Sequence, residues 1–393
     1  MMLKNQHMST TSLIVASLVV ATQLAVAQPL VGGPSTAARI NACVGKRREL
    51  IVALADIHAR QRNVGLSALI SMGGREIVST SLGHADLEHA VRVTPHTRFG
   101  VASITKAFTG VALLKLHESG RIDLDAPIQR YVPAFPEKSG GEITPRLLAA
   151  HLAGIRHWAS ERTPELYARH FDDINDIIPL FKDDTLVATP GTRYNYSSYG
   201  YNLLGAAIQS ASEMPYQSYV ERTVIAPLGL TATGFDDVRR VQPNRARRYS
   251  YFHPWTFVVD SHAVYRVPDW DYSHNMAGGN MYATAADLVR LGRALIRPGL
   301  LTQASLDLLY RQPKVGAVSS RMSFGFFVRD SAGVRRINIG GSNAGVQSAL
   351  YIYPDYELVI AVLSNAWGIG AQSGEMTGAL PERLAAICLG ARP

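Results

Sequence analysis

The hydrophobic positions of the chain follow two periods, and the period changes twice along its length. Residues 41–60 have apolar side chains at helical spacing. The next two stretches, "LSALISM" (66–72) and "REIVSTSLG" (75–83), have the composition of strands, with a turn at Gly73-Gly74 between them. The pattern therefore predicts a helix followed by a β-hairpin.

From about residue 100 to 290 the pattern is helical and rich in loops, with frequent Pro and Gly. Strand patterns return near the C-terminus, in "FGFFVRD" (324–330), "RRINIGG" (335–341) and the hairpin "SALYIYPDYELVIAVLSN" (348–365), before a last helix. Strands at both ends that enclose a helical middle predict an α/β (α+β) fold. We expect one antiparallel sheet flanked by N- and C-terminal helices, with a large, mainly helical insertion.

A serine and a lysine stand three residues apart at the start of one apolar run. Ser103 is followed by apolar side chains at roughly helical spacing, and Gly120 ends the run. Positions i and i+3 of a helix share a face, so Ser103 and Lys106 should lie side by side. A neutral lysine amine can take the proton of a serine hydroxyl if burial or a neighbouring cation lowers the lysine pKa. Taken alone, the pair favours a capping serine and a lysine whose stem packs on apolar surface, so further residues are needed to indicate catalysis.

Composition limits the classes of protein to be considered. The chain has 393 residues, of which 47% are hydrophobic, and a substantial core in one large domain or two lobes is expected. Its formal charge of +8 favours anionic surfaces. The densest basic run lacks interleaved aromatic residues and known reading motifs, so we expect an ion-paired or solvated surface and no nucleic-acid partner; it comprises Arg239, Arg240, Arg245, Arg247 and Arg248.

The N-terminus has the layout of a secretory signal peptide. Lys4 precedes an apolar segment that ends in small residues before Gln28, which predicts a signal peptide over residues 1–27, cleaved after Ala27. The apolar run is short for a bilayer-spanning helix, so we expect an exported protein, periplasmic or secreted, without a transmembrane anchor. Such a compartment permits a disulfide between the two cysteines, Cys43 and Cys388, although two separate buried thiols are an equal alternative.

Two other arrangements are weaker. The stretch "GHADLEH" offers His84, Asp86, Glu88 and His89, but no further ligand stands at a recognised spacing, and a surface loop without a metal is the better interpretation. A Ser-His-Asp triad would use Ser103 with a distant histidine. No G-x-S-x-G motif supports it.

Five further stretches, together with the S-x-x-K pair, resemble the serine β-lactamase and penicillin-binding-protein superfamily in its class C-like branch. They are "SGRIDLDAPIQRYVPAFP" (119–136), "ITPRLLAAHLAGIRHW" (143–158), "PGTRYNYSSYGYNLLG" (190–205), "PLGLTATGF" (227–235) and "AGGNMYATAADLVRLGRAL" (277–295). Several of them resemble the mitochondrial serine β-lactamase-like group. The resemblance implies a β-lactamase/transpeptidase-like fold, with no cofactor. It places one domain over residues 28–393, with an α/β lobe from about 40–100 and 290–393 and a helical lobe over about 101–289.

The resemblance also assigns roles to residues. It implies that Ser103 is the acylated nucleophile, that Lys106 shares its proton, and that Tyr196 of Tyr196-Ser197-Ser198 stands for the tyrosine of the family's Y-x-N element. A phenol held near an ammonium is expected to have a depressed pKa and to shuttle protons. Ser198 would occupy the position of the substrate-contacting Asn. Without the resemblance Tyr196 would be a core aromatic, and its neighbours Tyr194, Tyr199 and Tyr201 would be equally eligible.

The third family element is where the chain departs from the pattern. The family has K-T-G or H-x-G on the strand that lines the pocket, and this chain has Ile339-Gly340-Gly341. An isoleucine cannot bind a carboxylate. We therefore expect weaker recognition of penicillins and of peptides with a free carboxylate, unless Asn338, Arg335 or Arg336 substitutes. Esters, amides and internal peptide bonds are better candidates.

The oxyanion hole can survive this change because the family builds it from backbone N–H groups, here those of Ser103 and Ser342. Gly340 and Gly341 would let the strand approach the substrate closely, although glycines of an ordinary edge strand or bulge explain them too. The family fold also packs the first and last helices together, which favours the Cys43–Cys388 disulfide. His151 and His157 lie in a family stretch and are expected to be hydrogen-bonded scaffold residues.

The sequence thus predicts an exported serine hydrolase that acts through an acyl-enzyme on peptide, amide or ester bonds. Its substrate would be a small molecule or peptide, with peptidoglycan-derived peptides among the candidates. The alternative is a catalytically silent envelope-binding or scaffolding protein of the same fold, which the loss of a basic residue at Ile339 suggests. The sequence leaves open whether β-lactams are hydrolysed, which of Lys106 and Tyr196 is the working base, and the oligomeric state.

Overall fold

The computed structural model describes residues 35–158, 164–253, 256, 258–260, 262–331, 333–368 and 374–390. The predicted signal peptide, residues 1–27, lies outside the described residues. The elements below belong to one compact unit, Thr36–Pro393. The division of this unit into two lobes at the predicted boundaries stays a prediction.

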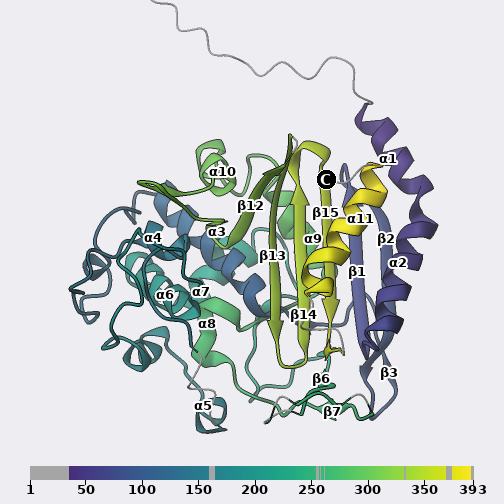
Figure 1. The fold of residues 1–393 in the computed structure, drawn as a ribbon, viewed down its shortest axis with the longest axis horizontal. Coiled ribbons are helices and arrows are strands. Elements are labelled where there is room, and N and C mark those ends of the chain that lie inside the picture. The colour runs from purple at the N-terminus through teal and green to yellow at the C-terminus, as the bar shows by residue number, and fades with distance from the viewer. Residues whose placement is uncertain are drawn as a thin grey trace, which may run out of the picture. The chain divides into compact units, whose positions relative to one another are not determined.

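The centre of the fold is an eight-stranded antiparallel sheet with strand order β11-β12-β13-β14-β15-β1-β2-β3 (Figure 1). Its strands are β1 (Gly65–Met72), β2 (Arg75–Asp86), β3 (Val91–Arg92), β11 (Met322–Ser323), β12 (Phe326–Ser331), β13 (Val334–Asn343), β14 (Val346–Tyr353) and β15 (Leu358–Ser364). The two ends of the chain thus form one sheet, as the sequence predicted. The connection between the two sets of strands is the long, mainly helical middle of the chain.

The central strands are buried on both faces, which explains their nearly continuous apolar sequence. On β15, Leu358, Ile360 and Val362 face one core, whereas the alternate residues Val359, Ala361 and Leu363 face the other. The first core lies under α1 (Thr36–Gly45), α2 (Arg47–Arg60) and α11 (Leu380–Leu389), which cover one face of the sheet in Figure 1. Helix α9 (Ala285–Ala294) packs on the opposite face.

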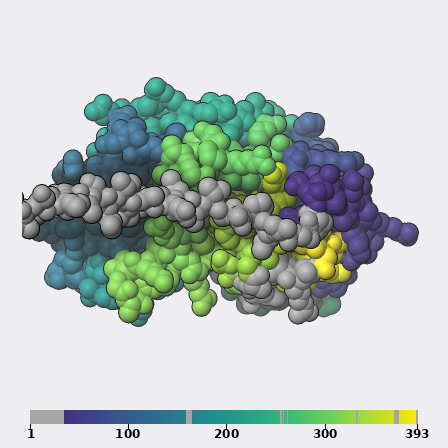
Figure 2. All heavy atoms as spheres, turned by 90° about the horizontal axis from the view of Figure 1, so that it is seen from above, coloured from purple at the N-terminus to yellow at the C-terminus, as the bar shows by residue number. Residues whose placement is uncertain are grey.

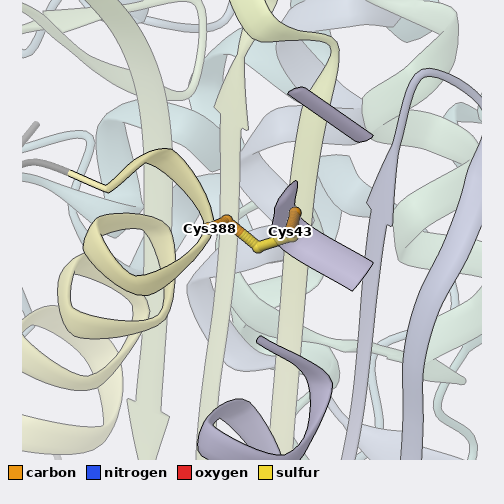
Figure 3. The surroundings of a disulfide bond; sticks show 2 residues. All are labelled: Cys43 and Cys388. Carbon is orange, nitrogen blue, oxygen red and sulfur yellow. A yellow bond between two sulfur atoms is a disulfide. The ribbon is translucent and has the colours of Figure 1, made fainter. Parts of the chain in front are cut away.

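The N- and C-terminal helices lie side by side. The first described residues (purple) and the last (yellow) are neighbours in the space-filling view of Figure 2, and α11 contacts both α1 and α2. A disulfide joins Cys43 of α1 to Cys388 of α11, with the sulfur atoms 2.04 Å and the Cα atoms 4.3 Å apart (Figure 3). The bond closes the chain over a separation of 345 residues.

Between the two sets of strands the chain forms two long helices, α3 (Thr105–Glu118) and α6 (Ser198–Ser212), and several shorter ones. The shorter α-helices of this region are α4 (Pro145–Ala149), α5 (Pro164–Ala168), α7 (Tyr216–Val220), α8 (Met276–Gly279) and, after α9, α10 (Gln303–Tyr310). Helices α3 and α6 are largely buried and pack against each other.

The remaining strands are short and were not anticipated from the sequence. They form sheets ordered β4-β8-β5, β16-β6-β7 and β10-β9, with bounds β4 (Phe99–Gly100), β5 (Gly234–Phe235), β6 (Tyr249–Ser250), β7 (Tyr265–Arg266), β8 (Met281–Ala283), β9 (Lys314–Val315), β10 (Val318–Ser319) and β16 (Ala366–Trp367). Strands of two or three residues are too short to show a period. The predicted helix over 41–60 is also two helices, because the chain leaves helical hydrogen bonding at Lys46.

The basic run of the helical region is paired, as expected. Asp236 binds Arg245 and Arg248 at 2.7 and 2.5 Å, and Arg247 binds Asp86 at 2.9 Å. Arg239 and Arg240 both pair with Asp237. Among the residues that the structure describes, no helix has the length and apolar character needed to cross a bilayer.

Candidate active site

Ser103 lies in a short helical turn that neighbouring backbone holds in place. The turn η1 (Ala102–Ile104) leads directly into α3, so the expected helix does begin near the serine. Thr105 Oγ1 donates to the carbonyl of Ala102 (2.8 Å) and accepts from the N–H of Met281 in β8 (3.1 Å). Ala102 has φ +45°, a region that residues with a side chain rarely adopt, and this strain stands one residue before the serine hydroxyl.

Lys106 is completely buried below this turn. Its Nζ lies 3.4 Å from Ser103 Oγ, 3.1 Å from Ser198 Oγ and 2.5 Å from the carbonyl oxygen of Gly278. Burial disfavours the charged ammonium and lowers the lysine pKa to about 7. A substantial fraction of this amine is therefore neutral near pH 7, which is the requirement that the S-x-x-K pair had to meet.

Tyr196 reaches the same hydroxyl from the loop before α6. Its phenol donates a hydrogen bond of 2.8 Å to Ser103 Oγ, and its ring centroid lies 4.8 Å from Lys106 Nζ. The expected depression of its pKa is not found. Burial, which disfavours a phenolate, instead raises the pKa of Tyr196 above the usual value. The phenol is consequently protonated at neutral pH, and the buried lysine is the group whose pKa moves towards neutrality.

Two histidines hold the loop that carries Tyr196, as the sequence led us to expect. The backbone N–H groups of Ser197 and Ser198 donate to Nδ1 of His151 (3.0 Å) and of His157 (3.2 Å), respectively. The His151 ring also packs on the Tyr196 ring, with centroids 4.4 Å apart. Burial lowers the pKa of His151 well below its usual value, so the ring stays neutral and can accept this bond.

Strand β13 approaches the serine turn through one of its two glycines. A Cβ atom on Gly341 would lie 2.2 Å from the carbonyl oxygen of Val101 and 3.0 Å from the backbone nitrogen of Ser103, so only glycine fits there. Ser342, the next residue, lines the same cavity as Ser103. Gly340 points to the other side of the strand, where a Cβ atom would lie 3.0 Å from Thr377 Cβ. Of the two predicted glycines, Gly341 is therefore the one next to Ser103.

Ile339 does not face the cavity. It is completely buried in the apolar core that contains α3. The residues considered as substitutes are placed elsewhere: Arg335 pairs with Asp355 at 2.5 Å, Arg336 pairs with Glu382 at 2.9 Å, and Asn338 is not among the described lining residues of the cavity. None of the three replaces the family's basic residue at this place.

The cavity at Ser103 has a volume of about 160 Å³ and is largely aromatic. Its described lining consists of Ala102, Ser103, His157, Trp158, Tyr167, Tyr196, Ser198, Trp270, Tyr272, Asn275, Ser342, Asn343, Ala344 and Trp367. Sequence reasoning missed Asn275, the carbonyl of Gly278 and most of these aromatic residues. The stretch "AGGNMYATAADL" contains Gly278 and was a signal for it, but only as a family likeness. Asn275 lies just before that stretch and had no such signal. Trp158 ends the family stretch "ITPRLLAAHLAGIRHW" and Tyr196 was predicted, whereas the other lining aromatics lie outside the family stretches and left no sequence signal: Tyr167, Trp270, Tyr272 and Trp367.

The group considered for a metal is an exposed ion-pair cluster. Oxygen and nitrogen atoms of Asp86, Glu88 and His89 lie within 4.8 Å of one another. Asp86 also pairs with Arg247 at 2.9 Å and with His89 at 2.8 Å. The contacts of Asp86 are thus those of a surface ion-pair network that ties the β2 end to residue 247.

Known proteins of similar sequence and structure include β-lactamase-like proteins and hydrolases. The human mitochondrial serine β-lactamase-like protein LACTB is 31% identical over 321 residues, which cover 64% of this chain and 57% of the relative. The chain thus spans little more than half the length of this relative. The solved structure of EstCE1, a hydrolase with promiscuous acyltransferase activity, has a TM-score of 0.70 at 22% identity, over 88% of this chain and 99% of its own. A D-stereospecific amidohydrolase from Streptomyces sp. has a TM-score of 0.68 at 24% identity, over 88% and 99%.

These two structural likenesses establish the fold and no more, because both identities are low. The family model described as Beta-lactamase matches residues 46–379, a range that includes Ser103, Lys106, Tyr196 and Ser342. With a match over most of its length and a β-lactamase/transpeptidase-like fold, the chain belongs to the β-lactamase family and has the fold of its serine hydrolases.

Proposed function

We propose that this protein is a serine hydrolase that cleaves ester, amide or internal peptide bonds through an acyl-enzyme on Ser103. The observation that carries the proposal is the contact of one hydroxyl with two proton-handling groups. Ser103 Oγ lies 3.4 Å from a buried lysine amine and 2.8 Å from a phenol. A serine that served only as a helix cap would need neither a buried lysine nor a phenol at its hydroxyl.

The proposed reaction assigns one proton transfer to each group. In acylation, neutral Lys106 takes the Ser103 proton while Oγ forms a bond to the carbonyl carbon. The N–H groups of Ser103 and Ser342 stabilise the resulting oxyanion. When the bond to the leaving group breaks, Tyr196 gives its proton to the leaving group and regains one from the Lys106 ammonium. Water then replaces the leaving group in the reverse sequence and releases the acid.

The lining of the cavity favours the binding of neutral substrates over substrates that carry a carboxylate. Its described lining contains no Lys or Arg, and Ile339 lies in the core. A substrate carboxylate would lose its hydration without gaining an ion pair. We therefore propose that penicillins, which carry such a carboxylate, are poor substrates, and that neutral esters and amides are better ones. The two structural neighbours, described as a hydrolase and an amidohydrolase, agree with these bond types.

The test is the intact mass of the protein after exposure to a fluorophosphonate and, separately, to a penicillin. We expect one fluorophosphonate adduct, absent in Ser103→Ala, and little or no penicillin adduct. Adducts from both reagents would mean that a carboxylate site exists and would contradict the substrate preference. No adduct from either reagent would reject the hydrolase and favour the alternative, a silent binding or scaffolding protein of the same fold.

We also propose that the protein is exported, from the pattern of residues 1–27. The disulfide between α1 and α11 agrees with an oxidising compartment. The human relative is named as a mitochondrial protein, so the alternative to a signal peptide is a mitochondrial transit peptide. N-terminal sequencing of the mature protein separates the two: export predicts Gln28 as its first residue, and a start elsewhere would contradict this cleavage.

A further inference from the structure

The cavity next to Ser103 has the size of one aromatic ring. Its volume is about 160 Å³. An apolar protein cavity of about 150 Å³ is known to take up benzene. A single ring attached near the scissile carbonyl would therefore fill the space.

The walls of this cavity are fixed by contacts among the aromatic residues themselves. Tyr167 and Trp270 stack with their ring centroids 4.7 Å apart, and Tyr272 meets Tyr167 edge-on at 5.5 Å. All three side chains are nearly buried, with exposed fractions between 3% and 6%. Rings held in this way present a preformed apolar surface, and offset or edge contacts with a substrate ring add to area burial.

One polar side chain borders the cavity without a complete set of partners. Asn275 is 6% exposed, and its Oδ1 has no hydrogen-bond partner among the described residues. Gly278 and Gly279 make room for its carboxamide, since Cβ atoms there would lie 2.2 Å from Oδ1 and 2.4 Å from Nδ2. Rotation about the last side-chain bond can present either end of the carboxamide to a ligand. A substrate amide, whose N–H can donate to Oδ1 and whose carbonyl can accept from Nδ2, can satisfy such a group.

The position of Asn275 relates it to the proposed catalytic groups. The carboxamide packs against the Cα of Gly278, and the carbonyl of the same residue accepts the 2.5 Å bond from Lys106 Nζ. By family resemblance, Ser198 occupies the position of the substrate-contacting Asn. Its hydroxyl accepts a 3.1 Å hydrogen bond from Lys106 Nζ instead. Asn275 is thus a carboxamide close to the place where Ser198 cannot supply one.

We infer that the site selects an uncharged acyl group that carries one aromatic ring and an amide, with the ring in the aromatic cavity and the amide on Asn275. Esters and amides of N-acylated aromatic amino acids are substrates of this class. The inference rests on the proposed function, because it names the acyl group that Ser103 would carry. Asn275 acts in it as a positioning residue for the substrate amide.

Three methyl esters test the two contacts separately. N-acetylphenylalanine methyl ester has both features, N-acetylalanine methyl ester lacks the ring, and methyl 3-phenylpropionate lacks the amide; chiral esters are tested as both enantiomers. Methanol as the leaving group keeps aromatic rings out of every other part of the substrate. We expect kcat/KM for the full ester to exceed each truncated ester by about 10-fold or more. Equal values for the three esters would overturn the inference.

Variants show whether the named residues cause the preference. Trp270→Leu should lower the ratio of the phenylalanine to the alanine ester, and Asn275→Ala should lower the ratio of the amide-bearing to the amide-free ester. Phe181→Leu is the matched control, because Phe181 is also buried and stacks on Tyr199 at 4.6 Å but does not line the cavity. An equal fall of the ring ratio in Phe181→Leu and Trp270→Leu would overturn the assignment of the cavity.

Fluorophosphonate labelling of Ser103 separates failure of this inference from failure of the proposed function. Labelled protein that shows no preference among the three esters contradicts only the acyl-group assignment. Unlabelled protein contradicts the hydrolase itself. Faster cleavage of phenyl acetate than of the phenylalanine ester would place the ring in the leaving group, and would also overturn the inference.

Discussion

At the scale of single residues, the same burial acts in opposite directions on the two proton-handling side chains. It lowers the pKa of Lys106 to about 7 and raises the pKa of Tyr196. Near pH 7 the pair therefore starts as an amine and a protonated phenol. This state makes the lysine the base that receives the Ser103 proton, and it leaves the phenol as the acid for the leaving group. A tyrosinate base would require the opposite order of pKa values.

Replacement of the phenol tests this division of roles. Tyr196→Phe removes the 2.8 Å hydrogen bond to Ser103 Oγ but keeps the ring that packs on His151. Because proton transfer to the leaving group would be lost, we expect kcat for a neutral ester to fall about 100-fold. Steady-state kinetics measure the change.

The matched control is Tyr194→Phe, which removes a phenol from the same loop. Tyr194 also lies against His151, with ring centroids 5.9 Å apart, but the described hydrogen bond from a phenol to Ser103 comes from Tyr196 and not from Tyr194. We expect less than a threefold change in its kcat. A similar loss in both variants would show that the loop, and not the Tyr196 hydroxyl, determines the rate.

At the scale of elements, the candidate site depends on how closely β13 packs against η1. Gly341 is the contact point, and the carbonyl of Val101 in front of η1 also accepts a 2.7 Å bond from Ser348 Oγ on β14. The two N–H groups proposed for the oxyanion are held at a fixed spacing by this contact between a strand and a turn. Neither element alone has that geometry.

A methyl group at Gly341 should separate the strand from the turn. In Gly341→Ala the new Cβ would start 2.2 Å from one backbone oxygen and 2.4 Å from Ser348 Oγ, so β13 must shift. Loss of one oxyanion contact predicts a fall in kcat of about 100-fold or more. Gly340→Ala meets Thr377 on the other side of the strand, and we expect a much smaller fall. Equal losses in ester hydrolysis would mean that the contact with η1 is not the cause.

At the scale of the whole molecule, the disulfide connects the two ends of the described unit. Neither of its cysteines lines the cavity or belongs to the helical region. The bond joins the helices that cover one face of the sheet. Its expected role is stability, because a cross-link over 345 residues restricts the unfolded chain.

We expect the double variant Cys43→Ser/Cys388→Ser to lose several kcal/mol of unfolding free energy, because the chain-entropy description gives about 6 kcal/mol for a loop of this length. Denaturant titration measures this loss, and ester hydrolysis of the folded variant should stay close to that of the parent protein. The parent protein in reductant is the control and should lose stability to a similar extent. Unchanged stability in both samples would contradict a structural role for the bond.

The sequence predicted those elements that are long enough for their apolar residues to show a helical or strand period. The apolar runs of β14 and β15 and the helix after Ser103 were found because each continues for seven or more residues. The break at Lys46 and the short strand β8 were missed, because a single turn or three residues carry no period. The spacing of Ser103 and Lys106 also predicted their contact, since both lie on one helical face.

The rest of the candidate site depends on tertiary contacts that no local pattern encodes. Trp158 and Tyr167 are nine residues apart, whereas Trp270 and Trp367 come from distant segments, and the four side chains meet only in the folded chain. Family likeness located Tyr196 but gave the wrong direction for its pKa, because the burial that raises this pKa is a property of the fold. Gly340 was grouped with Gly341, although neighbouring residues of a strand point to opposite sides.

The central claim is that Ser103 is a nucleophile activated by the neutral form of Lys106. It is tested most directly by the second-order rate constant for fluorophosphonate labelling of Ser103 between pH 5 and pH 9. The protonated lysine has no lone pair, so the rate should fall about tenfold per pH unit below a midpoint near pH 7 and reach a plateau above it, in line with a Lys106 pKa of about 7. A rate that does not change across this range, or that still rises at pH 9 as for an ordinary lysine, would contradict the account.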